Sequence, residues 1–263
     1  MSDENPILLE HDGSVAVVTL NRPHAMNALS RQLFTELYDT MDKLDEDDET
    51  SVIVVTGAGG KAFSAGADIS EFAKIRSTED AVAVYSEAVT EATHALFGAR
   101  KPMIAQIEGF CIGGGLGVAM CCDLRIAAAD SRFAIPAAKL GLGYKLDGLK
   151  ILVDQIGPAA AKEILFTARQ FDAQEAYDMG LVNRVLPPGE VQASVNDTAR
   201  TIADNAPLTV LAAKTVIGEA IKDLDERDLE LCQKVVDDCF QSNDYQEGQK
   251  AFMEKRKPEF KGR

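Results

Sequence analysis

Residues 101–129 read KPMIAQIEGFCIGGGLGVAMCCDLRIAAA, and this stretch decides the fold class. The short apolar runs at 103–108 and 124–129 are strand candidates. Residues 113–122 between them are apolar on every side, which is typical of a helix that is buried all round. A buried helix flanked by two strands predicts an α/β fold.

The same alternation extends toward the N-terminus. Residues 15–20 (VAVVTL) and 52–56 (VIVVT) are continuous β-branched runs, which indicate strands covered on both faces. Residues 30–45 carry apolar side chains at helical spacing, with Ser30 placed to cap the first turn. We expect a further helix near 78–97. Repeated strand–helix units of this kind predict α/β architecture.

The pattern changes after Gly157. Pro158 suits the first position of a helix over 159–168, and Asp172 with Glu175 predicts a capping box before a short helix that Gly180 ends. From Val191 onward the pattern is helical. We expect a core over 1–195 and a helical appendage over 196–263, whose exposed apolar faces need a partner.

Composition excludes several classes of function. With Lys+Arg 27 against Asp+Glu 42, the net charge of −15 disfavours nucleic acids and anionic membranes as partners. The five cysteines are odd in number and lie in apolar runs, which indicates reduced, intracellular thiols and no metal site. No apolar run approaches the roughly 20 residues of a membrane span. We therefore expect a cytoplasmic protein.

Two glycine-bearing segments, 56–69 (TGAGGKAFSAGADI) and 109–117 (GFCIGGGLG), are candidates for ligand binding. Lys61 is followed by Ala62 where a phosphate-binding P-loop needs Ser or Thr, and the spacing around Gly114 does not fit a dinucleotide fingerprint. Backbone N–H groups at the start of a buried helix can instead bind a carbonyl oxygen that becomes negative. Close packing of helix on sheet explains the glycines equally well, so both interpretations stay open.

Three motifs in order carry a family resemblance. Residues 22–29 (RPHAMNAL), 61–69 (KAFSAGADI) and 101–143 together resemble the signature of the crotonase (enoyl-CoA hydratase/isomerase) family. The resemblance implies a core of repeated ββα turns over 1–195 with two nearly perpendicular sheets. It also implies a trimerisation region over 196–263, homotrimers or dimers of trimers, and an acyl-CoA thioester whose coenzyme A is part of the substrate rather than a separate cofactor.

The resemblance also assigns site residues. The backbone N–H groups of Ala67 and Gly114 match the family's oxyanion donors. The residues that match the coenzyme A contacts of the family are Met26, Ala28, Ala65, Gly66, Ala67, Asp68, Ile69 and Ser70.

The sequence departs from the family pattern at two positions that matter for chemistry. Family hydratases carry two glutamates that position and activate water, and this chain has Gly117 and Ala137 in their places. General acid–base assistance contributes roughly a hundredfold to ten-thousandfold to a rate. We therefore expect no ordinary hydratase activity.

The C-terminal half resembles the methylmalonyl-CoA decarboxylase branch of the family. In that branch a tyrosine matching Tyr144 lies near the acyl group, and a lysine matching Lys255 reaches a coenzyme A phosphate. That branch differs by a histidine at Ala67 and a glutamate at Gly117. Asp147 is the nearest carboxylate to the vacated positions, although Asp-Gly is also an ordinary turn pair. An acyl-CoA lyase or isomerase, a decarboxylase and a non-catalytic acyl-CoA-binding protein are the three hypotheses.

Overall fold

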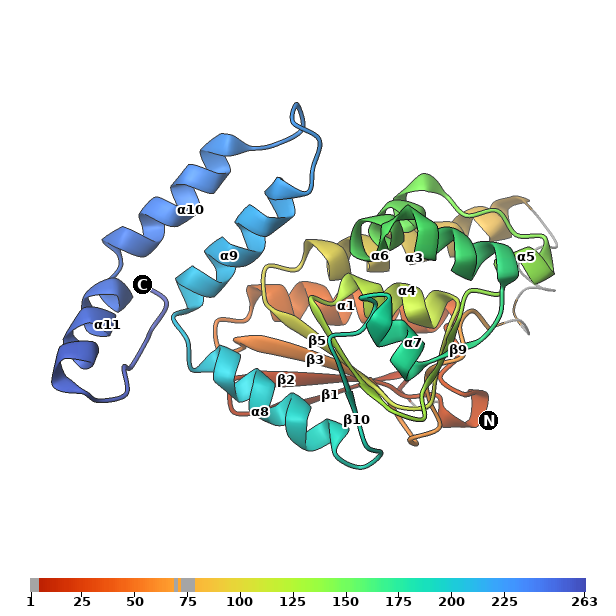
Figure 1. Ribbon diagram of the computed structural model, residues 1–263, viewed down its shortest axis with the longest axis horizontal. Helices are drawn as coiled ribbons and strands as arrows, with labels where there is room; N and C mark the ends of the chain where they lie inside the picture. The colour runs from red at the N-terminus through yellow and green to blue at the C-terminus, as the bar shows by residue number, and fades with distance from the viewer. Residues whose placement is uncertain (1–4, 69–70, 72–78) are drawn as a thin grey trace.

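The computed structural model describes residues 5–68, 71 and 79–263, and its architecture is mixed α/β (Figure 1). Ile69 and Ser70 lie outside the described residues, so their predicted contact with coenzyme A stays a prediction. Among the described residues, no helix combines the length and the apolarity that crossing a membrane requires.

A six-stranded sheet forms the centre of the molecule, in the order β1-β2-β3-β5-β7-β10. β1 and β2 form an antiparallel hairpin, and the remaining neighbours pair in parallel. The strands are Ile7–Asp12, Val15–Leu20, Val52–Gly57, Met103–Ile107, Leu124–Ala128 and Arg184–Leu186. The predicted strands at 15–20, 52–56, 103–108 and 124–129 are therefore confirmed to within a residue.

Helices cover both faces of this sheet, which explains the continuous apolar runs of its strands. α1 (Arg31–Glu46) and α3 (Glu79–Gly98) pack against each other on one side, together with the buried helix α4 (Gly114–Cys121). On the opposite face, α8 (Val191–Ala203) buries its apolar stripe against β3, β5 and β7 (Figure 1). The Ser30 hydroxyl accepts a hydrogen bond from the Leu33 N–H, so the predicted N-cap of α1 is confirmed.

A second, four-stranded sheet has the order β4-β6-β8-β9. Its strands are Ala62–Ser64, Phe110–Ile112, Arg132–Ala134 and Phe171–Asp172. β4, β6 and β8 are parallel to one another and follow β3, β5 and β7 in the chain. The chain therefore passes from the large sheet to the small one and then to a helix, which is the repeated ββα unit that the resemblance implied.

The region after β8 contains one correction to the sequence analysis. α5 (Ala137–Leu140) is followed by α6 (Leu146–Thr167), which breaks at Gly157, where φ is 75°. Asp147 and Gly148 lie in the first turn of α6, so their interpretation as a turn pair is wrong. An acidic residue in a first turn is stabilised by the helix dipole, which competes with the turn propensity of Asp-Gly. The capping box of α7 (Ala173–Asp178) is present as predicted, from Asp172 to Glu175.

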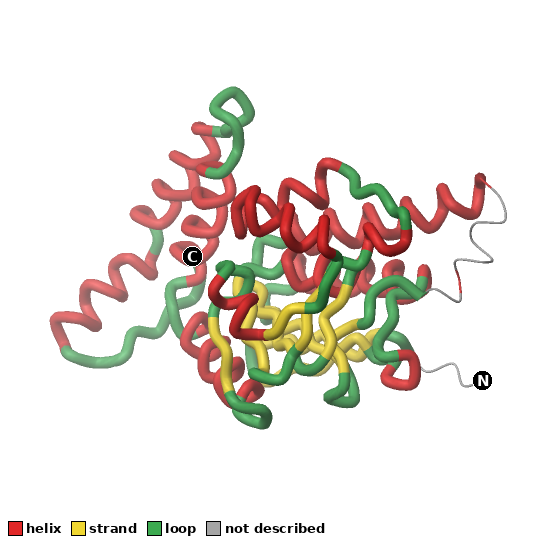
Figure 2. Tube along the Cα trace, turned by 45° about the vertical axis from the view of Figure 1, so that its right-hand side comes forward, coloured by secondary structure: helices red, strands yellow, loops and turns green. Residues whose placement is uncertain are grey.

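The last three helices form an arm that extends away from the two sheets (Figures 1 and 2). They are α9 (Pro207–Ala220), α10 (Leu229–Gln241) and α11 (Asn243–Glu254). The predicted boundary between 195 and 196 falls inside α8, whose Val195 and Ala199 are both buried against the large sheet. The tail folds back on the arm, where the Asp244 carboxylate accepts hydrogen bonds from the N–H groups of Lys261 and Gly262.

Candidate active site

α4 begins at the point where the two glycine-bearing segments meet. Gly115 is buried, and a Cβ atom there would lie 2.6 Å from the backbone oxygen of Ser64 in β4. Gly66 has φ of 93°, and a Cβ atom there would lie 2.8 Å from the backbone oxygen of Ile112. Glycine at these two positions therefore allows the loop after β4 to contact the start of α4, as the close-packing interpretation expected.

Ala67 and Gly114 direct their backbone N–H groups to the same space. A Cβ atom on Gly114 would lie 3.8 Å from the Ala67 nitrogen, so the two backbone N–H groups are adjacent. Neither N–H has a hydrogen-bond acceptor among the described residues. Gly114 is the first residue of α4, where N–H groups lack intrahelical partners and the helix dipole is positive. The arrangement can bind a carbonyl oxygen that gains negative charge.

Residues 65–68 are joined to residues 26–29 by backbone hydrogen bonds. Ala65 donates to the Met26 oxygen at 2.9 Å, while Leu29 pairs with Ala67 in a parallel bridge. An ion pair of 2.8 Å between Arg22 and Asp68 adds a side-chain link. Six of the residues predicted to bind coenzyme A are thus brought together: Met26, Ala28, Ala65, Gly66, Ala67 and Asp68.

A buried amide supports the turn that precedes Leu29. The side chain of Asn27 is fully buried, donates to the backbone oxygens of Ala58 and Ala62, and accepts from the Arg22 N–H. Met26 and Asn27 both have φ near 54°, a left-handed conformation that is unfavourable for methionine. Sequence analysis missed the roles of Asn27 and Arg22, because no local pattern identifies them and because Ala58, Ala62 and Asp68 are distant in the chain.

The two positions that match the family glutamates lie on α4 and at the start of α5. Gly117 is half-buried, and a Cβ atom there would meet no heavy atom of the described residues within 4 Å. Ala137 is buried, and it follows Pro136, whose ring approaches the Cβ position of Gly113 at 3.9 Å. The space beside Gly117 is open, and neither position carries a group that can transfer a proton.

Tyr144 lies in the loop between α5 and α6 with 40 % of its surface exposed. Partial burial raises the pKa of its phenol, so the hydroxyl stays protonated at neutral pH and can donate a hydrogen bond or a proton. No contact recorded among the described residues joins Tyr144 to Ala67 or Gly114. The side chain of Asp147 lies outside what the structure describes, so its predicted role stays a prediction.

Lys255 is not near the paired N–H groups in this chain. It is exposed and ends α11 in a left-handed conformation, with φ of 55°. Figure 1 places α11 at the far end of the arm, well separated from α4. Within one subunit, α11 therefore does not place Lys255 beside Ala67.

The opposite end of α4 is buried among thiols and one cation. Burial raises the pKa of Cys121 to about 12 and raises those of Cys111 and Cys122 as well. The guanidinium of Arg125, which is 5 % exposed, donates to the backbone oxygens of Cys122 and Leu181. A cation at a helix C-terminus offsets the negative end of the dipole. These thiols are protonated and inert, so nucleophilic thiol chemistry is not their role.

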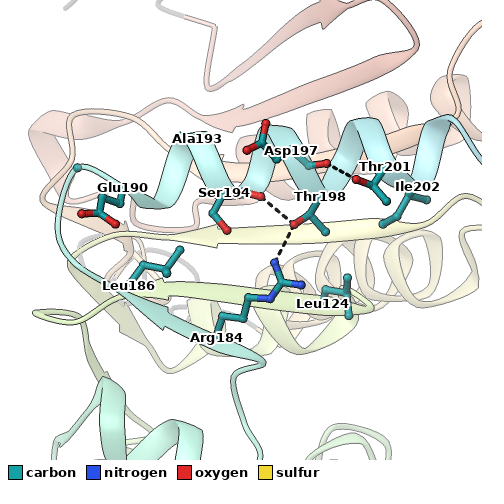
Figure 3. Close-up of a pocket in the computed structure, with 11 residues that line it drawn as sticks. Leu124, Arg184, Leu186, Glu190, Ala193, Ser194, Asp197, Thr198, Thr201 and Ile202 are labelled. Atoms are coloured by element: carbon teal, nitrogen blue, oxygen red, sulfur yellow. Dashed lines mark hydrogen bonds between the residues drawn. The ribbon is translucent and has the colours of Figure 1, made fainter.

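A separate groove of about 620 Å³ runs between α8 and the edge strand β10 (Figure 3). Part of its polar lining is paired, since Arg184 donates to the Thr198 hydroxyl, which in turn donates to the Ser194 backbone oxygen. Its described lining includes none of the predicted site residues. The groove is therefore distinct from the site at α4.

Comparisons with known proteins agree with this geometry. A family model described as enoyl-CoA hydratase/isomerase matches residues 10–263. The chain is 37 % identical over 262 residues to a short-chain-enoyl-CoA hydratase of Clostridium acetobutylicum, covering 98 % of this chain and 99 % of the relative. It is 36 % identical over 261 residues to a crotonyl-CoA hydratase of Syntrophomonas wolfei, covering 99 % of each. A crystal structure of an enoyl-CoA hydratase/carnithine racemase from Magnetospirillum magneticum matches with a TM-score of 0.92 at 36 % identity, covering 99 % of this chain and 97 % of that one.

Proposed function

The chain belongs to the enoyl-CoA hydratase/isomerase (crotonase) family, and we propose that it stabilises the enolate of an acyl-CoA thioester at two backbone N–H groups. The donors are those of Ala67 and Gly114. The observation that supports this proposal most directly is that both donors lack acceptors among the described residues while lying next to each other. Each such donor contributes roughly 3 to 4 kcal/mol to transition-state stabilisation in other enzymes.

The reaction differs from ordinary two-glutamate hydration. Gly117 and Ala137 cannot activate water, so a water molecule at this site has no general base at the positions where family hydratases carry one. The donors still serve any reaction of the thioester that passes through an enolate. Isomerisation and carbon–carbon bond cleavage are such reactions.

Decarboxylation of a 2-carboxyacyl-CoA such as methylmalonyl-CoA is the second candidate, because the missing carboxylates favour it. When the bond between the α-carbon and the carboxylate breaks, its electron pair forms the enolate and carbon dioxide leaves, so no base is required. One proton must then be added to the α-carbon. The Tyr144 phenol, whose pKa is raised, or Asp147 is the proposed proton donor.

Coenzyme A enters the proposal as part of the substrate. Residues 26–29 and 65–68 form two backbone segments that are hydrogen-bonded to each other, and coenzyme A would bind along their edge. Ile69 and Ser70 continue the second segment, and Lys255 of another subunit would supply a cation to the phosphates. A trimer, or a pair of trimers, would bring that lysine to the site.

A non-catalytic acyl-CoA-binding protein is the competing function. Purified protein incubated with crotonyl-CoA, 3-enoyl-CoA and methylmalonyl-CoA, with products identified by mass spectrometry, separates the candidates. We expect turnover of 3-enoyl-CoA or methylmalonyl-CoA and little hydration of crotonyl-CoA. Rapid hydration of crotonyl-CoA contradicts the role given to the two absent carboxylates, and tight binding without turnover of any thioester identifies a binding protein.

The donor at Gly114 has a direct test. Gly114→Pro removes the N–H at the first helical position, where proline is compatible with the helix. We expect kcat/KM to fall by roughly a hundredfold or more, the usual cost of one oxyanion donor. Gly114→Ala is the matched control, because it keeps the N–H and introduces the same Cβ atom beside Leu29. Equal activities of the two variants would refute the assignment.

A further inference from the structure

We propose that Arg22 and Asp68 are positioning residues that fix the direction of the Ala67 N–H in the oxyanion site. This inference rests on the proposed function, because it concerns how one of the two donors is held. Neither side chain is assigned a catalytic role. Asp68 directly follows Ala67, and Arg22 joins Asp68 to the backbone of Ala28 in the facing segment.

The bridge between Leu29 and Ala67 determines which way the donor points. Leu29 donates its N–H to the Gly66 oxygen at 2.8 Å and accepts from the Asp68 N–H at 3.1 Å. In a parallel bridge of this kind, the residue facing Leu29 uses none of its own backbone groups. The Ala67 N–H is therefore turned away from Leu29, and it lies beside the Gly114 N–H.

The guanidinium of Arg22 holds both sides of this bridge. One of its nitrogens contacts the Asp68 carboxylate at 2.8 Å, and another donates to the Ala28 oxygen at 2.5 Å. Ala28 precedes Leu29, and Asp68 follows Ala67. A single planar cation thus joins the two backbone segments next to the paired residues. The guanidinium of arginine can reach both partners through separate nitrogens, whereas the one ammonium of lysine cannot.

Burial makes this ion pair more than a surface contact. The Arg22 and Asp68 side chains are 20 % and 10 % exposed. Exposed pairs on this protein differ, since Arg200 and Asp12 are 61 % and 65 % exposed at a similar distance of 2.9 Å. Removal of either member of the buried pair leaves the other charge unpaired and poorly solvated, which is unfavourable. Residues 66–68 would therefore shift to bring that charge into contact with water. A small displacement of a catalytic group can cost about a hundredfold in rate.

A third contact holds the backbone of Leu29. The Tyr85 hydroxyl donates to the Leu29 oxygen at 3.4 Å, the oxygen that also accepts from Asp68. Leu29 therefore remains anchored by α3 when the Arg22 pair is removed. Loss of the pair is expected to loosen the Ala67 side of the bridge and not to unfold the turn.

The test uses the full-length chain and butyryl-CoA isotopically labelled at the thioester carbon. Difference infrared spectroscopy measures how far the carbonyl stretch moves to lower frequency on binding, which reports the hydrogen bonds to its oxygen without any turnover. We expect a clear shift with the wild-type chain. Arg22→Met and Asp68→Asn should retain less than half of it, and kcat for the thioester that the wild-type chain turns over should fall roughly tenfold to a hundredfold.

Two further variants separate positioning from general stability. Arg22→Lys should recover part of the carbonyl shift, because an ammonium can bond one of the two partners. Arg200→Met, the same change in the exposed pair, should leave the shift and kcat unaltered. Thermal unfolding checks that each variant is folded, and Asp68→Asn, which preserves side-chain shape, carries the test if Arg22→Met does not fold.

The outcomes distinguish the inference from the function on which it rests. A wild-type shift that persists in full in Arg22→Met and Asp68→Asn overturns the positioning role alone. Binding of butyryl-CoA without any wild-type shift overturns the proposed oxyanion site, and the positioning role with it.

Discussion

Gly117 occupies a position where the resemblance implies a glutamate in family hydratases, and we predict that the missing side chain changes the chemistry of the site while the fold is retained. The residue lies on α4, three positions after the proposed donor Gly114, and a Cβ atom there would meet open space. Nothing in the packing of the described residues requires glycine at this position. We therefore predict that the absent carboxylate reflects the reaction and not a steric restriction. At Ala137, which is buried, a larger side chain must displace its neighbours.

Restoring both carboxylates should restore hydration in part. We expect the double variant Gly117→Glu with Ala137→Glu to hydrate crotonyl-CoA roughly a hundredfold faster than the unaltered chain, the lower range of acid–base assistance. Loss of the ultraviolet absorbance of the enoyl thioester measures the rate. Gly98→Glu is the control, because it places the same side chain at another open helical glycine. A folded double variant with no gain would contradict the interpretation of these two positions.

α4 is an element with different environments at its two ends. Its N-terminus presents to the candidate site N–H groups that have no acceptor in the described part of the chain, and its C-terminus is capped by Arg125 and surrounded by buried thiols. Its body is apolar on every side, with Leu116, Val118 and Ala119 all buried. A helix held in this way cannot shift easily, which suits a fixed pair of donors.

The buried thiols predict a loss of stability at alkaline pH. Their pKa values are raised in the folded protein, to about 12 for Cys121, whereas unfolded thiols ionise near pH 8.5. Below that pH the thiols are protonated in both states. Above it the unfolded state alone loses protons, so each thiol lowers the free energy of unfolding by about 1.4 kcal/mol per pH unit.

Urea unfolding between pH 8.5 and 10.5 measures this effect. The free energy of unfolding of Cys121→Ala should decline less steeply with pH than that of the wild-type chain, by about 1.4 kcal/mol per pH unit. Cys232→Ala removes a half-buried thiol outside this cluster and serves as the control. Identical slopes for wild type and Cys121→Ala would contradict the prediction.

At the scale of the whole molecule, the helical arm leaves apolar side chains in solvent. Leu224, Leu229 and Phe252 are 81 %, 70 % and 86 % exposed, and they lie on or between the helices α9, α10 and α11. Exposed apolar side chains occur on all three helices of the arm, with Ile217 on α9, Phe240 on α10 and Met253 on α11. Apolar exposure along a whole element indicates an interaction surface. The resemblance implies a trimer at this region, and such an assembly would also explain how Lys255 reaches a site in another subunit.

A charge on the arm should therefore weaken assembly without unfolding the subunit. We expect Phe252→Glu to lower the molar mass measured by light scattering at micromolar concentration, while the circular dichroism of the chain is retained. Tyr177→Glu is the matched control, because Tyr177 is an exposed aromatic residue of α7, which lies outside the arm. Unchanged assembly in Phe252→Glu would exclude this face from the interface.

The sequence by itself determined the covered strands, the buried helix α4, the caps at Ser30 and Asp172, and the absence of carboxylates at Gly117 and Ala137. These features depend on periodicity and on residue identity within a few positions, so the sequence alone identifies them. The tertiary structure alone decided the short strands of the second sheet, the first turn of α6 at Asp147, and the pairing of Arg22 with Asp68. Strands of two or three residues carry too little periodicity to identify. Contacts between residues far apart in the chain depend on how the elements pack, and this packing also brings the N–H groups of Ala67 and Gly114 together.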